Sequence, residues 1–308
     1  MYIMFTFTEL QILCAESIFL KYSLALLIFI IIKQVWSRQF ACSGNEKSQI
    51  EKKVIDIGQS ISIDSTNDGA DDDDNDYNTN YVDDYKPHLP EREHIPYGGL
   101  TECLDRSGEL FYKLTNDRRS IRKFNKNKPV DIGVIKKCIL TAGTSPSGAH
   151  TEPWTFCVIQ DAQIKRKIRE IIETEEYLNY KQRMSRQWTA DLRPLKTDFI
   201  KEYLTDAPFI ICVFKQVYGI RSDATKQRHY YNEISVSIAT GILLCALNAA
   251  GLNSLVTTPL NCGPAIKNLL NRPQNEKLLV LLPVGYSADD CLVPDLQRKP
   301  LDQIMITY

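Results

Sequence analysis

The strongest hydrophobic signal of the chain is an apolar stretch near its N-terminus. Most residues of 10–35 are apolar, and the strongest run is 22–32 (YSLALLIFIII). Glu16 and Lys21 interrupt the stretch, so the roughly 20 apolar residues that a membrane span requires are only marginally available. We interpret residues 1–40 as an N-terminal membrane anchor.

Two interpretations of this stretch compete, a secretory signal peptide and a single-pass anchor. A signal peptide carries positive charge ahead of its apolar region, whereas no Lys or Arg precedes Lys21 here. The anchor fits better, because Lys33, Trp36 and Arg38 follow as a basic, aromatic stop-transfer flank. Basic residues on this side predict a membrane protein whose following domain lies in the cytosol.

Residues 41–100 have the composition of a linker. The segment 64–84 holds nine aspartates and no Lys or Arg, so it cannot build an apolar core and we expect it to be disordered. Calcium binding at 71–74 is the alternative, but these four aspartates lack the spacing of an EF-hand loop. We interpret the linker as a solvated spacer before a domain at 101–308.

From about residue 100 onward, helical and strand-like apolar patterns alternate. Apolar residues at helical spacing predict helices at 131–142 and 161–180, and 230–250 is apolar nearly all round, as expected of a buried central helix. The tail 292–308 ends in the strand-like 304–308, which lacks an intrachain hairpin partner, so we consider pairing with a second subunit. Short apolar runs bounded by Pro, Gly or Asn predict strands at 155–159, 208–214, 254–258 and 277–284.

Composition excludes several classes of protein. A net charge of −1 over 308 residues argues against a nucleic-acid partner, which requires a broad basic surface. The nine cysteines form no CxxC pair and read as reduced thiols. Four histidines without a His/Cys cluster predict no metal site.

Two polar segments carry the candidate chemistry. The segment 118–122 (RRSIR) offers three guanidiniums and a hydroxyl, and guanidiniums suit bidentate capture of a phosphate. The loop 143–154 is rich in Gly, Ser and Pro, so its backbone amides can approach a flat ligand closely. A solvated basic turn is the plain alternative for the first segment, and the lone His150 is more simply structural. Together the segments predict a phosphorylated, planar cofactor.

Two further segments are weaker candidates. Thr257 and Thr258 stand at a strand end before a proline, where hydroxyls can donate to a ring heteroatom. Threonine at such a place is also an ordinary β-forming residue. Arg298 lies in the late segment 293–299 and can reach a phosphate or a ring oxygen.

Four motifs, in this order, resemble the iodotyrosine deiodinases of the FMN-dependent nitroreductase superfamily. The resemblance spans about 90–308, and generic nitroreductases share the arginine motif but not the longer strings. It implies an α+β, nitroreductase-like FMN-binding fold, with a central mixed sheet flanked by helices, in an intertwined homodimer with two FMN sites shared between subunits. The motifs are RRSxR at 118–122, PSGAHTEPW at 146–154, TTPLNCG at 257–263 and VPDLxRK at 293–299.

The resemblance also implies which residues hold FMN. The arginine motif would bind the phosphate and the pyrimidine edge, and Thr258 would act in catalysis through a hydrogen bond to flavin N5 that favours one-electron steps. Val256 stands where a third threonine is expected, which removes no proposed contact. The implied FMN residues are Arg118, Arg119, Ser120, Ile121, Arg122, Ser147, Val256, Thr257, Thr258 and Arg298.

Glu176, Tyr180 and Lys201, here called the substrate clamp, have the charges to bind an amino-acid zwitterion. Glu176 and Tyr180 are four residues apart, on one face of a helix. By sequence alone a surface ion-pair set is the simpler interpretation, but all three match the lid of the deiodinases, here 177–204. The resemblance implies that the backbone N–H of Ala149 donates a hydrogen bond to the substrate phenolate. An ortho halogen lowers the pKa of a phenol, so halogenated tyrosine is anionic near neutral pH whereas tyrosine is not.

The implied reaction is FMN-dependent reductive dehalogenation of mono- and diiodotyrosine to tyrosine and iodide. The reducing equivalents would come from NADPH through a partner reductase. Two alternatives stay open, a broad NAD(P)H-dependent nitro- or quinone reductase and a non-catalytic flavoprotein that binds halotyrosines. The clamp argues against the first, because a quinone reductase has no need to bind a zwitterion.

Overall fold

The computed structural model describes residue 89, residues 92–97 and residues 106–308. Contacts divide the chain at Asn67, and all described residues belong to the second unit, Asp68–Tyr308. The predicted anchor at 1–40 lies outside the described residues, as does nearly all of the predicted linker.

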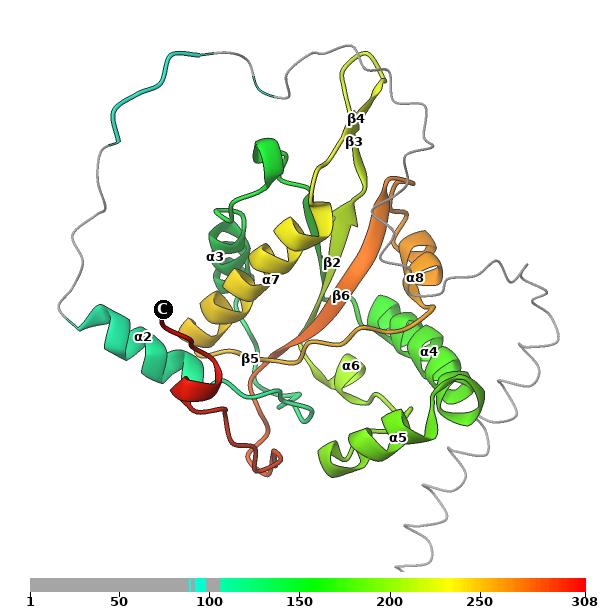
Figure 1. The fold of residues 1–308 in the computed structure, drawn as a ribbon. Coiled ribbons are helices and arrows are strands. Elements are labelled where there is room, and N and C mark those ends of the chain that lie inside the picture. Colours follow the sequence, from blue (N-terminus) through cyan, green and yellow to red (C-terminus); the bar gives the residue numbers. More distant parts are fainter. Residues whose placement is uncertain (1–88, 90–91, 98–105) are drawn as a thin grey trace, which may run out of the picture. The chain divides into compact units, whose positions relative to one another are not determined.

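A four-stranded sheet in the order β1-β2-β6-β5 forms the centre of this unit (Figure 1). All three pairs are antiparallel, and the parallel part of the expected mixed sheet is an isolated bridge between Ser120 and Ser254. A second, two-stranded sheet pairs β3 with β4 in a projecting hairpin. The strands are β1 (Trp154–Ile159), β2 (Phe209–Gln216), β3 (Tyr218–Ile220), β4 (Lys226–Arg228), β5 (Asn253–Ser254) and β6 (Glu276–Gly285).

Strand β2 is apolar throughout its first six residues because it is buried on both faces. Ile210, Cys212 and Phe214 join the core on one face, and the odd-numbered residues between them join the core on the other. Helices α4 (Ala162–Leu178) and α8 (Gly263–Leu269) cover the first face, whereas α3 (Ile132–Ala142) and α7 (Asn232–Ala249) cover the second (Figure 1). Because successive side chains of a strand point to opposite faces of the sheet, β2 contributes to both layers of the core.

The predicted strand at 254–258 is shorter than expected. Residues 253–254 pair with β6, and Thr257 resumes the same register by exchanging hydrogen bonds with Leu281. Between them Leu255 donates to the carbonyl of Pro283 at 3.3 Å, but proline has no N–H to return the bond. Pro283 therefore interrupts the ladder, and within 256–258 only Thr257 pairs, as an isolated bridge to Leu281.

Helix α7 is buried on one face and exposed on the other, although its sequence is apolar nearly all round. One face packs in the core through residues such as Val236, Leu243 and Leu247, whereas Ile234 and Ile238 are 58% and 43% exposed. Among the described helices, α7 alone has the length and hydropathy of a membrane span, a property that core helices share. The prediction of a fully buried central helix is wrong for the single chain, since apolar pattern does not say what covers each face.

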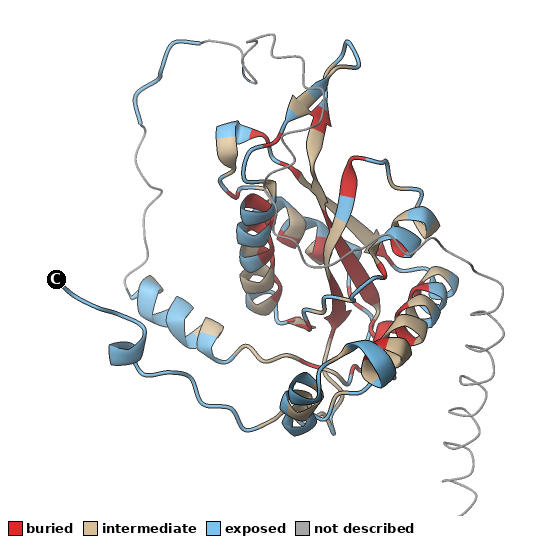
Figure 2. Cartoon of the chain, turned by 45° about the vertical axis from the view of Figure 1, so that its right-hand side comes forward, coloured by how far each residue is buried: buried red, intermediate tan, exposed pale blue. Residues whose placement is uncertain are grey.

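Several short elements escaped the sequence analysis. Helix α2 (Ser107–Asn116) has no buried residue and is coloured mainly as exposed in Figure 2, in contrast to the sheet.

Residues 304–308 form no strand and are exposed, so their pairing with a second subunit stays a prediction. The remaining elements are η1 (Gly148–His150), η2 (Asn179–Arg183), α5 (Arg186–Leu192), η3 (Arg193–Leu195), α6 (Tyr203–Asp206) and η4 (Leu301–Gln303).

Candidate functional site

The arginine segment is fixed at the β5 edge of the sheet. Ser120 pairs with Ser254 of β5 in an isolated parallel β-bridge, and the Ile121 N–H donates to the Ser254 carbonyl at 3.1 Å. The Ile121 side chain turns into the core and is 6% exposed. This anchoring directs the flanking Arg119 and Arg122 side chains to one cavity, while Ile121 offers no side-chain contact there.

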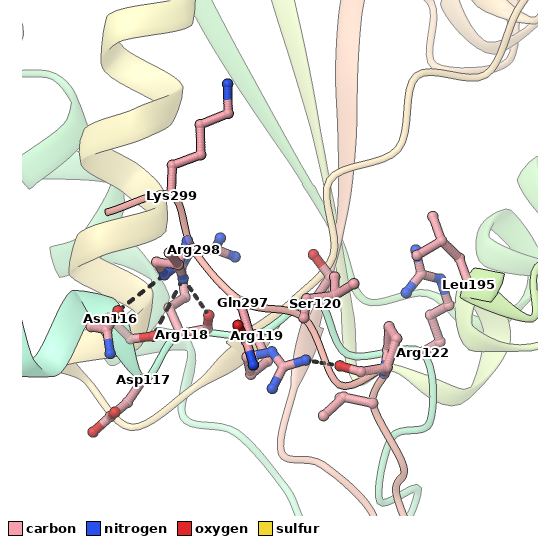
Figure 3. Close-up of a pocket in the computed structure, with 13 residues that line it drawn as sticks. Asn116, Asp117, Arg118, Arg119, Ser120, Arg122, Leu195, Gln297, Arg298 and Lys299 are labelled. Atoms are coloured by element: carbon pink, nitrogen blue, oxygen red, sulfur yellow. Dashed lines mark hydrogen bonds between the residues drawn. The ribbon is translucent and has the colours of Figure 1, made fainter. Parts of the chain in front are cut away.

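That cavity, of about 820 Å³, lies between the arginine segment and the C-terminal tail (Figure 3). It is lined by residues of 116–122 and 293–299, and by Leu195 from the predicted lid. Arg119 Nη2 donates to the Pro294 carbonyl. Two chain segments about 175 residues apart in sequence therefore build one site.

Arg298 joins the tail to the arginine segment from the other side. Its Nε donates to Asn116 Oδ1 at 3.1 Å, and its Nη2 donates to the Arg118 carbonyl at 3.3 Å (Figure 3). The fixed fork of a guanidinium suits such simultaneous contacts. Arg298 is thereby placed beside the arginine motif.

We call this site the cationic cavity, because four arginines contribute to its lining. The lining includes Arg118, Arg119, Ser120, Arg122 and Arg298. Lys299 adds a fifth cation, and Asp117 is the one carboxylate among its described lining residues. An anionic group such as a phosphate suits this arrangement. Within the described ranges, no group of three or more His, Cys, Asp or Glu side chains is placed to hold a metal ion.

The glycine-rich loop is tightly shaped and packs against the start of α7. A Cβ on Gly148 would lie 2.8 Å from the Tyr230 carbonyl oxygen, so only glycine fits. Ala149 has a φ of 49°, in the left-handed region that non-glycine residues rarely adopt. Ser147 Oγ accepts a hydrogen bond from the Glu152 N–H at 3.0 Å. Neither Ser147 nor Ala149 lines the cationic cavity of the single chain.

The segment 256–258 follows β5 along the sheet edge. Val256 is 38% exposed, and Thr258 is also exposed. Hydrogen bonding from the Thr257 side chain acts to lower the pKa of the Tyr203 phenol, against the larger effect of burial. None of the three lines the cationic cavity.

The structure brings the three clamp residues together. Lys201 Nζ lies 3.3 Å from Glu176 Oε2 and 5.7 Å from the centre of the Tyr180 ring. Lys201 is only 5% exposed, so its pairing with Glu176 matters for keeping a buried charge compensated. Burial, with the nearby Glu176 charge, raises the pKa of Tyr180, which keeps its phenol protonated and able to donate. The arrangement offers one anion, one cation and one neutral donor.

Tyr203, which the sequence analysis missed, lies near residues of both the clamp and the cationic cavity. Its phenol is buried, and burial raises its pKa above the ordinary value. Arg122 and Glu176 are both close enough to influence it electrostatically, in opposite directions. The only available signal was its position two residues after Lys201, on the same short segment. Tyr203 shows that the two sites are neighbours.

The sequence profile of the nitroreductase family matches residues 115–286, which contain the arginine segment, the loop, the clamp and Thr258. Iodotyrosine deiodinase of Drosophila melanogaster is 58% identical over 227 residues, covering 73% of this chain and 79% of the relative. The chain belongs to the nitroreductase family, on its iodotyrosine deiodinase branch. Iodotyrosine deiodinase 1 of Homo sapiens is likewise 58% identical over 219 residues, covering 70% of this chain and 75% of the relative.

Solved structures agree with this membership of the nitroreductase family. An oxidised iodotyrosine deiodinase bound to FMN and 3-iodo-L-tyrosine has a TM-score of 0.54 and 30% identity, covering 64% of this chain and 98% of that one. A BluB-like flavoprotein from Clostridium difficile 630 has a TM-score of 0.51 at 22% identity, which supports the fold alone, with 64% and 98% covered.

Proposed function

We propose that this chain is an FMN-dependent enzyme that reductively removes iodide from mono- and diiodotyrosine. The carrying observation is the placement of Glu176, Tyr180 and Lys201 in one cluster beside a strongly cationic cavity. Similarity to iodotyrosine deiodinases over more than two thirds of the chain supports the same conclusion. In the net reaction, two electrons and one proton replace the C–I bond by C–H and release iodide.

The cationic cavity fits the phosphate of FMN, and the cofactor supplies the electrons when bound. Arg118, Arg119, Arg122 and Arg298 would hold the phosphate and the pyrimidine edge with charge-assisted hydrogen bonds. Ser120 contributes a hydroxyl from the same wall. We assign the Thr258 hydroxyl the catalytic contact with flavin N5, and Val256 and Thr257 the neighbouring ring edge. Ile121 contributes through its backbone, since its side chain lies in the core.

The clamp would exchange its internal ion pair for the charges of the substrate. Glu176 would take the substrate ammonium, while Lys201 and the protonated Tyr180 would take its carboxylate. Each buried charge then keeps a partner of opposite sign, which avoids the cost of an uncompensated ion. The lid at 177–204 would exclude water when substrate is bound.

A homodimer accounts for the proposed residues that do not line the single-chain cavity. Ser147 and Ala149 lie on the loop that packs against α7, whose Ile234 and Ile238 are exposed on the outer face. An exposed apolar face of this kind suits burial in a subunit interface. Two FMN sites would then be shared between subunits, with Ser147 reaching the flavin and the Ala149 N–H reaching the substrate phenolate.

The remaining proposals concern the electron donor, which the family resemblance implies, and the membrane anchor. We propose an NADPH-dependent reductase as electron donor and a single-pass anchor in residues 1–40 that holds the catalytic domain on the cytosolic side of a membrane. The polar linker at 41–100 would separate the two.

Anaerobic incubation of the FMN-loaded protein with dithionite and diiodotyrosine tests the proposal. The expected result is stoichiometric release of iodide and formation of tyrosine. A nitro- or quinone reductase would instead consume NAD(P)H with quinones and leave diiodotyrosine intact. Tight halotyrosine binding without tyrosine formation would identify a non-catalytic binder.

A further inference from the structure

Helix α4 carries a polar stripe that leads to the clamp. Lys165, Arg169 and Glu173 recur at intervals of four residues, and Glu176 follows three residues after Glu173. Residues at these spacings lie on one face of a helix. Lys165 and Glu173 are 8% and 7% exposed, which is unusual for charged side chains. Their partners explain the burial.

All three side chains hold residues 201–207, which comprise the end of the lid and the turn that leads into β2. Lys165 Nζ donates to the Ala207 carbonyl at 2.6 Å, and Arg169 Nη1 donates to Thr205 Oγ1 at 3.1 Å. Glu173 Oε1 accepts from the backbone N–H of Lys201 at 2.7 Å. The stripe therefore ties residues 201–207 to α4 at three successive points.

Glu173 is the contact that bears on substrate recognition. The oxygen that accepts from the Lys201 N–H also accepts from Arg169 Nε at 2.7 Å, so the buried carboxylate is charge-compensated and held in one orientation. Glu176 stands one turn further along the same helix and meets the Lys201 side chain at 3.3 Å. One helix thus fixes both the backbone and the ammonium of Lys201.

We infer that Arg169 and Glu173 are positioning residues that hold Lys201 in place for the carboxylate of the amino-acid substrate. This rests on the proposed function, because it assigns Lys201 to that carboxylate. Neither residue touches substrate. They build one side of the clamp before substrate arrives, so that ordering Lys201 does not subtract from the binding free energy.

Two ligands that differ only in the carboxylate test the inference. Binding of 3-iodo-L-tyrosine and of 3-iodotyramine, which lacks the carboxylate, is measured by flavin fluorescence in the full-length, FMN-loaded protein. Glu173→Ala is expected to weaken iodotyrosine binding by about 10- to 100-fold, the range for a lost hydrogen bond to a charged group. Its Kd for iodotyramine and for FMN is expected to stay within a factor of about two, because Lys201 contributes to neither.

Rescue and control variants separate positioning from a general loss of structure. Glu173→Gln keeps an acceptor for the Lys201 N–H and is expected to restore most of the iodotyrosine affinity. Arg166→Ala removes an exposed charge on the same helix, outside the stripe and the lid, and should leave both Kd values unchanged. If Glu173→Ala does not fold, Arg169→Lys replaces it, since lysine lacks the fixed fork with which Arg169 contacts Glu173 through Nε and Thr205 through Nη1.

Equal weakening of iodotyrosine and iodotyramine, or no change for iodotyrosine in a folded Glu173→Ala protein, would overturn the inference. The same holds for Arg169→Lys where that variant is used. A wild-type protein that holds FMN but does not bind iodotyrosine would instead refute the proposed function itself.

Discussion

The cationic cavity and the substrate clamp treat their charges in opposite ways. In the clamp, Lys201 already pairs with Glu176, so the cluster is close to neutral. In the cavity, Arg119 and Arg298 donate to carbonyl and amide oxygens, which satisfy their N–H groups without cancelling their charge. The cavity therefore keeps a net positive field suited to a dianionic phosphate, whereas the clamp suits a zwitterion that brings both signs. Charge compensation within the chain thus indicates the ligand class of each site.

The largest effect is expected from Arg119→Ala. This change removes a cation from the cavity and the bond to the Pro294 carbonyl that joins its two walls. FMN affinity should fall by about 3 kcal/mol, or roughly 150-fold, as for a hydrogen bond to a charged group. Fluorescence titration of apoprotein with FMN measures it. The exposed Arg166→Ala on α4 is the control, and equal FMN binding by both variants would contradict the role of the cavity.

Glu176→Gln should separate the two regions. It removes the only carboxylate of the clamp and leaves the cationic cavity intact, so FMN affinity should not change. Affinity for 3-iodo-L-tyrosine should fall by about 2 kcal/mol, or roughly 30-fold. Arg166→Gln, at an exposed position of the same helix, provides the control. Unchanged deiodination by Glu176→Gln would refute the clamp.

A smaller effect is expected from Gly148→Ala, in the loop that lies outside both regions of the single chain. The added methyl would stand 2.8 Å from the Tyr230 carbonyl oxygen and must displace the loop from α7. We expect a loss of about 1.5 kcal/mol in the free energy of unfolding, typical of overpacking. Urea denaturation measures it, and Gly108→Ala, where a Cβ meets open space, is the control. A free energy of unfolding equal to that of the unsubstituted protein would contradict the close contact between Gly148 and Tyr230.

The smallest effect is expected for Glu276, a carboxylate that pairs with Arg272 outside both regions. It shows what a paired carboxylate contributes to stability where no ligand is proposed to bind. Burial raises the pKa of Glu276, but hydrogen bonds from Arg272 and Thr155 outweigh it, and the net pKa lies below the ordinary 4.5. The stabilisation is present above pH 4.5 and disappears as the pH falls through the lowered folded-state pKa. Glu276→Gln should cost about 1 kcal/mol of unfolding free energy at neutral pH. Denaturation at several pH values should show this difference shrinking on acidification, and a constant difference would contradict the assignment.

The sequence predicted the main elements because their apolar spacing follows directly from the geometry of helices and strands. The three long helices and the strands β1, β2 and β6 were expected within one or two residues of their observed bounds. The sequence-based predictions were wrong where a neighbouring segment determines whether a strand continues or whether a helix face is buried. The strand after Ser254 is cut short by Pro283 on the neighbouring strand, and no described part of the chain covers the outer face of α7 at Ile234 and Ile238.

By itself, the sequence determined the kinds of chemistry available, namely clustered guanidiniums, a glycine-rich loop and a carboxylate, phenol and ammonium at matching spacing. Only the tertiary structure decided which groups meet. It brings Arg298 to Asn116 across 182 residues and buries Lys201 against Glu173 and Glu176. These contacts have no periodic signal, because they depend on how the backbone returns through the sheet, whereas side-chain spacing reports only on neighbours within one helix or strand.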